Sequence, residues 1–569
     1  MVDHISPTTP ECPPDPLHHI GGNKAFIAAS PNPRDVINCG VVVSIFNSSS
    51  FFSSHSALPP TKPLSAIMPL SEPVPGIKPR LAPADIEVQP YQPEKELFVE
   101  DSPATPDEVV VDWDGPNDPA NPLNWSSARK TFIITVVSAV TFNISLVPTI
   151  FAPGVPLLLS EFHSESAALA SFAVSAYVVP FAISPLIVAP LSELYGRNVV
   201  MNTANFAFLV FTIVCAVSNG IALFLVFRIF QGLAGCVPLV LGGGMIGDLV
   251  PPEKRGRALS GWQLGPLLGP VIGPVAGGYI AQNVGWRWLF WLVAILSGVL
   301  TFLYLLIPET YHPTLLARKA ARLQKEDGSR AYFAARSTRI TARELLLKSI
   351  VRPLKMLCKS PIVLILSLQL AVTYGYLYLL FTTFVFVFEG QYQFEAGAAG
   401  LSYLGLGVGF LIGLAANSLT LDYIAKKEAK GGEIKPESRL APLLFGVLLV
   451  PAGLIWYGWS AQFKIHWIVP IIGTSLIGIG TNLVWVPVQS YLIDAFTIYA
   501  ASALAANTVV RSIFGVVLPL AGQPLYDKLG LGWGNTLLAF IALATTPLTW
   551  LVMKYGERIR LDPRFQLDL

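Results

Sequence analysis

The sequence predicts an all-α integral membrane protein built of two six-helix bundles, and three observations lead to this fold class. The 569-residue chain is 53% apolar and 13% charged, with a mean hydropathy of +0.56. A soluble protein carries about twice that charged fraction. Apolar runs repeatedly reach about 20 residues, the length that spans a bilayer as a helix. A polar segment, 308–360, divides twelve such runs into two groups of six.

The predicted spans lie in two bundles. The spans of the first bundle, 126–307, are 131–153, 167–189, 199–218, 221–246, 258–280 and 287–307. The spans of the second bundle, 361–554, are 361–387, 398–420, 441–459, 466–490, 499–523 and 534–553. Residues 1–125 are rich in Pro and Ser, so we expect a disordered tail there. Segment 308–360 is the predicted middle loop, and 555–569 is a short C-terminal tail.

Lys and Arg are distributed unevenly among the loops between the predicted spans. The middle loop, the loop 421–440 and the loop after the fourth span are rich in both residues, whereas loops 154–166 and 388–397 contain none. The positive-inside rule therefore places both termini and the middle loop in the cytoplasm. The formal net charge is only +2, and we expect no nucleic-acid partner.

The chain lacks the motifs of several chemistries. Its five cysteines form neither a CxxC pair nor a regular framework, so we expect no disulfide scaffold and no metal site. No GxxxxGK[ST] motif is present, so we expect no ATP bound by a P-loop and no cofactor. The spans hold no nucleophile–base pair, and an enzyme is therefore not expected.

The stretch "GPLLGPVIGPVAGG" in the fifth span repeats glycine every fourth residue. Such a period places the glycines on one slowly winding stripe, where a neighbouring helix can approach backbone to backbone. Proline removes helical hydrogen bonds, and the freed carbonyls need other partners. We expect a bent, closely packed helix at an interface between bundles that move, although tight pairing alone is an alternative. The residues concerned are Gly261, Gly265, Pro266, Gly269, Pro270, Gly273, Pro274 and Gly277.

Six motifs in order resemble those of one transporter family. "GPLLGPVIGPVAGGYI" is similar to the antiporter motif of drug/proton antiporters of the major facilitator superfamily, and "APLSELYGRN" resembles its loop signature. "RIFQGLAG", "GWRWLFW", "PETYHPTLLARKAARL" and "SYLIDAFTIYAASALAANTVVRSIFG" are similar to segments of fungal twelve-helix exporters. The resemblance covers about residues 108–560. It implies a fungal-type secondary transporter, driven by a proton gradient and monomeric.

The loop signature implies a gate at the cytoplasmic ends of the second and third spans. Gly196 permits a tight turn there, next to Glu193 and Arg197. Arg197 can pair with a carboxylate at a neighbouring helix end, for which we predict Asp248; a snorkelling arginine is the alternative. The family's usual glycine and second basic residue are replaced by Ala189 and Asn198, so one charge contact of the gate is missing.

Two arginines lie well inside predicted spans, where such a charge is costly and must face protein or water. In the family, the position of Arg228 is associated with proton coupling, together with Gln231 and Gly232 of the R-x-x-Q-G pattern. Arg511 has three possible partners: an anionic group of the substrate, an anchoring carbonyl, or Asp494 at a helix end. No Asp or Glu lies in the middle of a predicted span, so proton coupling rests on the resemblance.

A substrate cavity is expected near the bilayer midplane, between the two bundles. The polar and aromatic side chains that could line it suit an uncharged or weakly anionic, partly aromatic compound, although each could instead bond a neighbouring helix. The candidates are Asn143, Tyr177, Gln369, Tyr374, Asn482, Trp485, Gln489, Asn507 and Arg511.

The resulting prediction is a transporter that works by alternating access. We expect it to export a small hydrophobic or amphipathic compound, such as a secondary metabolite, toxin or drug, across the plasma membrane in exchange for protons. Organic-acid export is an alternative that Arg511 favours, whereas polyamine export is disfavoured because the spans lack central carboxylates. A non-transporting membrane receptor is a further alternative. The expected partners are the lipid bilayer, the small-molecule substrate and protons.

Overall fold

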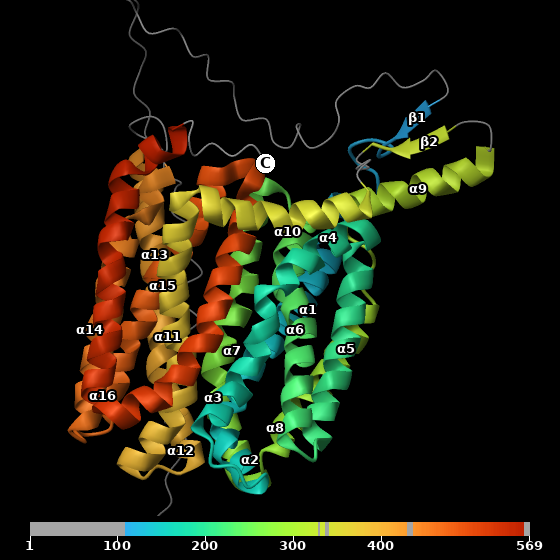
Figure 1. Ribbon diagram of the computed structural model, residues 1–569. Helices are drawn as coiled ribbons and strands as arrows, with labels where there is room; N and C mark the ends of the chain where they lie inside the picture. The colour runs from blue at the N-terminus through green and yellow to red at the C-terminus, as the bar shows by residue number, and fades with distance from the viewer. Residues whose placement is uncertain (1–107, 328–330, 336–340, 429–435, 563–569) are drawn as a thin grey trace, which may run out of the picture. The chain divides into compact units, whose positions relative to one another are not determined.

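The computed structural model describes residues 108–562, except 328–330, 336–340 and 429–435. Nearly all of the ordered structure is helical, as Figure 1 shows. The first half contains α1 (Ser127–Ile150), η2 (Ala152–Gly154), α2 (Val155–Glu161), α3 (Ala167–Ser175), η3 (Ala176–Ala182), α4 (Ser184–Tyr195), α5 (Arg197–Val217), α6 (Ile221–Leu249), α7 (Pro252–Val284) and α8 (Arg287–Leu305).

The second half repeats this helical organisation. It contains α11 (Pro361–Tyr392), α12 (Ala396–Leu401), α13 (Tyr403–Glu428), η4 (Pro436–Leu440), α14 (Leu443–Gln462), α15 (Ile468–Phe496), η5 (Thr497–Tyr499) and α16 (Ala500–Leu561). Between the halves lie α9 (His312–Asp327), β2 (Ala331–Ala334) and α10 (Ala342–Lys359). Two short elements precede α1: β1 (Glu108–Val111) and η1 (Pro122–Asn124).

The twelve predicted spans correspond to elements of this structure. Ten described helices are long and apolar enough to cross a membrane, and the pair Ala167–Ala182 and Ser184–Tyr195, bent by 48°, brings the number to eleven if it is one broken span. Helix α16 covers two predicted spans because a non-helical residue, Gly530, interrupts its 62 residues. Dividing α16 at this residue gives the twelfth span. The fold is therefore the all-α arrangement that the sequence predicts.

Large apolar side chains lie both in the interior of the helical halves and on their surface. The buried ones form two hydrophobic clusters, the smaller of which gathers residues of α10, α11, α14, α15 and α16 around Met356 and Tyr491. Others, such as Phe302, Leu419 and Phe445, are at least 65% exposed. Exposed apolar side chains on long helices fit lipid as the surrounding solvent, because lipid tails do not penalise them.

The segment before α1 is ordered, which corrects the predicted extent of the disordered tail. Residues 108–111 pair in parallel with residues 331–334 of β2, and Val111 is buried. Lys319 of α9 donates to the carbonyl of Asp112 and to the carboxylate of Asp114. The composition of residues 108–125 gave no sign of this order, because the burial comes from the middle loop. Residues 1–107 lie outside the described part of the chain.

The two halves meet through particular pairs of elements. Helix α7 contacts α12 and α13, while α3 and η3 contact α16. At the end where α12 lies, Gln282 of α7 accepts from the backbone N–H of Gly397 at 3.0 Å. At the other end, α10 lies against α4 of the first half and against α11 and α16 of the second (Figure 1). We name these two ends of the molecule the α12 end and the α10 end.

Candidate functional site

The predicted gating turn lies at the α10 end, between α4 and α5. Gly196 has φ +94° and ψ 155°, a backbone conformation that is essentially restricted to glycine. A Cβ atom on this residue would also lie 2.3 Å from Oε2 of Glu309. Two independent constraints, backbone conformation and space, therefore require glycine at this turn.

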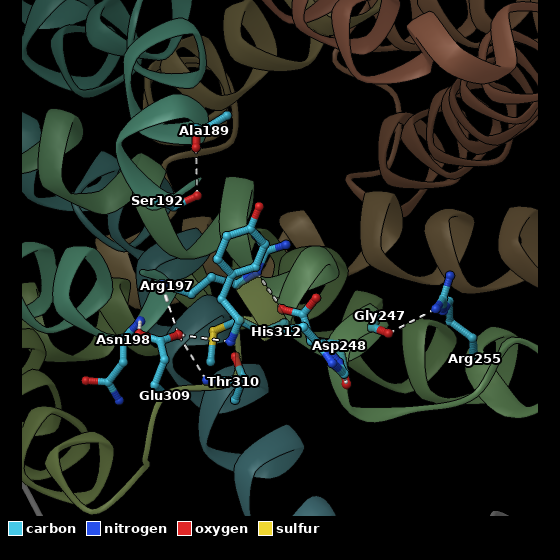
Figure 2. A network of polar contacts seen from close by, with 12 residues as sticks. Ala189, Ser192, Arg197, Asn198, Gly247, Asp248, Arg255, Glu309, Thr310 and His312 are labelled. Carbon is cyan, nitrogen blue, oxygen red and sulfur yellow. Dashed lines mark hydrogen bonds and ion pairs between the residues drawn. The ribbon is translucent and has the colours of Figure 1, made fainter. Parts of the chain in front are cut away.

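Arg197 and Asp248 form the predicted ion pair (Figure 2). The Nε atom of Arg197, at the start of α5, lies 2.5 Å from Oδ2 of Asp248, near the end of α6. Both side chains are mostly shielded, with exposed fractions of 16% and 14%. The guanidinium also lies 4.8 Å from the ring centroid of Tyr311. This contact joins three segments of the first half: α5, α6 and the chain after α8.

Glu309 completes the network and was given no role by the sequence analysis. Its buried carboxylate accepts backbone N–H groups from Arg197, Asn198, Thr310 and Tyr311 at 3.0 to 3.2 Å. Two of these donors are the first N–H groups of α5, which have no partner inside the helix. A carboxylate there also complements the positive end of the helix dipole. Glu309 thus fixes the start of α5 and the position of Arg197 (Figure 2).

Two residues of the loop signature differ from their expected roles. The side chain of Asn198 donates to the carbonyl of Ile307 and accepts from Asn202, so hydrogen bonds occupy the place of the missing basic residue. Glu193 is exposed and makes no ion pair or hydrogen bond with any described residue. The described hydrogen bonds and ion pairs of the network therefore do not include Glu193.

The end of α6 also contacts the middle loop and the beginning of the described chain. Nε2 of His312, the first residue of α9, lies 3.0 Å from the carbonyl oxygen of Asp248. The ring of Trp113 meets that of His312 edge to face, with centroids 5.7 Å apart. Arg255 of α7 donates to the carbonyl of Gly247. The segment before α1, the middle loop and the gate therefore form one connected group of contacts.

The glycine stripe of α7 packs against α1 of the same half. Cβ atoms on Gly265, Gly269, Gly273 and Gly277 would lie 2.1 to 3.0 Å from atoms of α1, most of them backbone atoms. Gly261, the first glycine of the repeat, is not part of this contact, because a Cβ atom there would have no neighbour within 4 Å. The predicted backbone-to-backbone approach is thus present, but the stripe itself faces α1 and not the other half.

Another face of α7 meets the second half. A Cβ atom on Gly278 would lie 2.3 Å from the carbonyl oxygen of Ala396, and one on Gly400 would lie 2.3 Å from that of Pro274. The helix runs without interruption through Pro266, Pro270 and Pro274. Helix α7 is therefore packed closely on both sides, against α1 in its own half and against α12 in the other.

Arg228 is fully buried inside the first half. Its guanidinium donates to Oε1 of Gln231 at 2.9 Å and to the carbonyl of Val147 at 3.0 Å. Gln231 in turn donates to Thr212 of α5. The rings of Phe151, Tyr177 and Phe290 surround the guanidinium, with centroids 5.2 to 5.3 Å from its central carbon. No described carboxylate pairs with it.

Gly232 and Tyr177 fix the surroundings of Arg228. A Cβ atom on Gly232 would lie 2.0 Å from the carbonyl oxygen of Tyr177, so α6 and η3 are in direct backbone contact there. The hydroxyl of Tyr177 donates to the carbonyl of Ile144. The pattern R-x-x-Q-G therefore brings Arg228, Gln231 and Gly232 into one buried, tightly packed group.

Arg511 lies among aromatic side chains of the second half. The central carbon of its guanidinium is 4.5 Å from the ring centroid of Trp485 on α15 and 5.1 Å from that of Tyr374 on α11. The two rings are themselves 5.7 Å apart. Arg511 makes no hydrogen bond and no ion pair with any described residue, and its buried Nε has no partner. Tyr374, Trp485 and Arg511 are the predicted pathway residues that the structure brings together.

Other predicted pathway residues bond neighbouring helices. Asn143 donates to Ser297 of α8, next to a groove lined in part by exposed residues such as Ile295. Gln369 accepts from Thr549, and Asn482 donates to the carbonyl of Phe410. These three side chains hold helices together, the alternative that the sequence left open for each of them.

The last three predicted residues have different surroundings. Gln489 is half-buried, one helical turn beyond Trp485 on α15. Asn507 is buried one turn before Arg511, and its Oδ1 atom has no hydrogen-bond partner. Asp494 pairs with Arg439, whose Nε lies 3.1 Å from Oδ2 of Asp494, and so is not the partner of Arg511. The described residues contain no group of His, Cys, Asp or Glu arranged to hold a metal ion.

Glu309 and His312 are the site residues that sequence reasoning missed. A signal was present, because both lie in "PETYHPTLLARKAARL", one of the six motifs that resemble the family. The motif did not indicate what Glu309 does, however, because the α5 backbone N–H groups that its carboxylate accepts belong to Arg197 and Asn198, more than 100 residues earlier in the chain. Only the folded chain shows that residue 309 lies beside the start of α5.

The fold and the site together define a polytopic membrane transporter of two helical halves. Residues 131–519 match the Major Facilitator Superfamily. The chain is 53% identical to the MFS-type transporter penM of Penicillium rubens, over 81% of this chain and 91% of penM. It is 44% identical to the efflux pump radE of Floropilus chiversii, over 81% and 87% of the two chains.

A solved structure shares the fold. The xylose transporter XylE from E. coli, in a partially occluded inward-open conformation, superposes with a TM-score of 0.56 at 17% sequence identity. The match covers 74% of this chain and 98% of XylE. The chain belongs to the major facilitator superfamily. It is therefore an integral, multi-pass transporter of small molecules and not an enzyme.

Proposed function

We propose that the chain exports a small hydrophobic or amphipathic organic compound by alternating access, in exchange for protons. The observation that carries this proposal is the packing of α7, the helix whose motif resembles that of drug/proton antiporters. Its glycine stripe holds α1, and its residues Pro274 and Gly278 meet α12 of the other half. A helix packed closely against both halves is suited to transmit a rocking motion between them.

The network at the α10 end supplies the gate of this proposal. The Arg197–Asp248 pair and the Glu309 carboxylate join α5, α6 and the middle loop. Separation of this pair would favour one orientation of the halves over the other. Asp248 and Glu309 are partly or fully shielded carboxylates at a helix end, and Arg228 is the buried cation of the proton-coupling motif. These residues are the proposed machinery of proton coupling.

Similarity to radE, an efflux pump, supports export as the direction, and resemblance to fungal exporters supports a secondary metabolite, toxin or drug as substrate. We place the protein in the plasma membrane, as a monomer. Organic-acid export is the second candidate, and Arg511, which forms no ion pair with a described residue, favours it over polyamine export.

Everted plasma-membrane vesicles from yeast that expresses the full chain test the proton coupling. An extract of the source organism's culture medium is supplied outside the vesicles, and an inside-acid gradient is imposed. We expect particular compounds to accumulate in these vesicles, but not in vesicles from yeast with an empty vector. A protonophore should abolish the accumulation. Accumulation that is unchanged by the protonophore would contradict proton antiport.

A further inference from the structure

Arg511 is a half-buried cation that makes no hydrogen bond or ion pair with any described residue, whereas the fully buried Arg228 makes two hydrogen bonds. Its position, near the middle of the first part of α16, is far from the helix ends where a long side chain reaches water. Charges at such depth are costly and are normally paired with a carboxylate or with carbonyls. Arg511 has neither among the described residues, and its Nε atom is buried and unsatisfied.

Two of the three partners that the sequence allows are excluded. Asp494 is occupied by Arg439, at 3.1 Å. No carbonyl of a described residue accepts from the Arg511 guanidinium, whereas Arg228 in the first half bonds both Gln231 and the carbonyl of Val147. Arg228 is thus held by hydrogen bonds within its own half, whereas the described contacts of the Arg511 guanidinium in its own half are with the rings of Tyr374 and Trp485. The remaining partner is an anionic group that comes from outside the chain.

The surroundings of Arg511 indicate what else such a ligand would carry. The guanidinium lies over the rings of Tyr374 and Trp485, which hold it by cation–π attraction without using its N–H groups. A planar guanidinium placed in this way can still donate two parallel hydrogen bonds to a carboxylate or a similar acid. The same rings offer apolar surface to an aromatic or unsaturated ligand. One turn earlier, Asn507 has an unpaired buried oxygen that can accept from a hydroxyl.

The group also lies where the two halves meet. Gly515, one turn beyond Arg511, packs on the ring of Tyr374, and a Cβ atom there would lie 3.6 Å from Val178 of η3 in the first half. A ligand bound to Arg511 is therefore adjacent to both halves, which is the position that alternating access requires of a substrate.

We infer that Arg511, Tyr374, Trp485 and Asn507 form a recognition site for an organic acid, in which Arg511 binds an ionised acidic group and the two rings contact an adjacent unsaturated body. The inference rests on the proposed function in taking this ligand as the transported compound. It narrows the substrate class from hydrophobic compounds in general to those that are anionic at neutral pH.

Matched pairs of acid and amide test the site, because the two members of a pair share their shape and differ in charge. The probes are 2-naphthoate with 2-naphthamide, and indole-3-acetate with indole-3-acetamide. Binding to the purified full-length chain in detergent is measured at pH 7.5 by isothermal titration calorimetry. We expect each acid to bind at least about tenfold more tightly than its amide, because a hydrogen-bonded charge contributes that much.

Variants assign the preference to Arg511. Arg511→Gln should remove the preference for the acid and leave binding of the amide unchanged, and Arg511→Lys should keep part of it, because the charge remains. Arg318→Gln is the matched control, since it removes an equal charge from the exposed face of α9. It should leave both affinities unchanged.

Three results overturn the inference: equal binding of acid and amide, absence of measurable binding of every probe, or a preference that survives Arg511→Gln. The inference and the proposed function fail separately. Acid-selective binding without proton-dependent accumulation in vesicles contradicts proton antiport but keeps the site. Proton-dependent accumulation of neutral compounds alone contradicts the site but keeps the transporter.

Discussion

At the scale of single residues, the gate depends on atoms that only the folded chain brings together. The sequence predicted that Gly196 permits a turn and that Arg197 pairs with Asp248, and both features are present. Glu309 could not be predicted in the same way, because its partners are backbone N–H groups and carry no signature in side-chain identity. Likewise, nothing in the sequence showed that Asp494 is occupied by Arg439.

Gly196→Ala should weaken the gate. The residue adopts a backbone conformation that costs an alanine about 1–3 kcal/mol, and the added methyl group would displace the Glu309 carboxylate. We expect a lower unfolding temperature in detergent and a loss of transport. Gly220→Ala is the control, because Gly220 is extended and has no neighbour within 4 Å of a Cβ position. Equal effects of the two substitutions would contradict this account of the turn.

Glu309→Gln should loosen the start of α5. An amide offers one acceptor oxygen and turns its own N–H groups toward the backbone donors of Arg197 and Asn198. We expect hydrogen exchange of peptides that cover 197–202 to become at least about tenfold faster, since a charge-assisted bond is lost. Glu326→Gln, on the exposed face of α9, should have no such effect. Unchanged exchange in Glu309→Gln would argue that the carboxylate does not hold this helix.

At the scale of elements, the sequence predicted where apolar helices lie along the chain, but it did not predict which helices pack against one another. Hydropathy identifies a span because lipid is an apolar solvent for every residue on its surface. It does not identify which helix a glycine stripe will face. The stripe of α7 was expected at an interface between bundles, yet it packs on α1, and Pro274 and Gly278 make the contact with the other half. Composition also did not predict the ordered structure of residues 108–125, because residues 108–111 pair with β2, which lies in the distant middle loop.

Gly277→Ala should disturb the packing of α7 on α1. The new methyl group would lie 2.1 Å from the carbonyl oxygen of Ile150, and overpacking of this kind costs about 1–3 kcal/mol. We expect a lower unfolding temperature and slower transport. Gly261→Ala lies on the same helix with open space around it, so it should be neutral or slightly stabilising. A neutral Gly277→Ala would show that the two helices are not in close contact.

Asp118 should anchor the segment before α1 through its ionised form. Backbone N–H groups of Asp114 and Ala120 donate to its carboxylate and lower its pKa below the ordinary value. Its contribution is therefore present at neutral pH and is lost only as the pH falls through this lowered pKa. Asp118→Asn should reduce the protection of 108–125 from hydrogen exchange at pH 7, whereas Asp112→Asn should not. Equal protection in both variants would contradict the anchor.

At the scale of the whole molecule, the halves are joined differently at their two ends. At the α12 end the halves meet directly, through α7 and α12. At the α10 end the loop helix α10 lies against both halves, beside the gate network. This arrangement is suited to the proposed alternating access, in which the interior faces one side of the membrane and then the other. In the proposed function, this change carries a compound out of the cell.

The most direct measurement compares metabolites inside the cells and in the medium, with the gene intact and with the gene deleted, in the source organism. We expect at least one compound to decrease in the medium and to accumulate inside the deletion strain, and we expect the intact gene to restore both levels. Identical profiles in the two strains would contradict export of a compound that the organism makes. A compound that instead accumulates in the medium of the deletion strain would contradict the direction of transport.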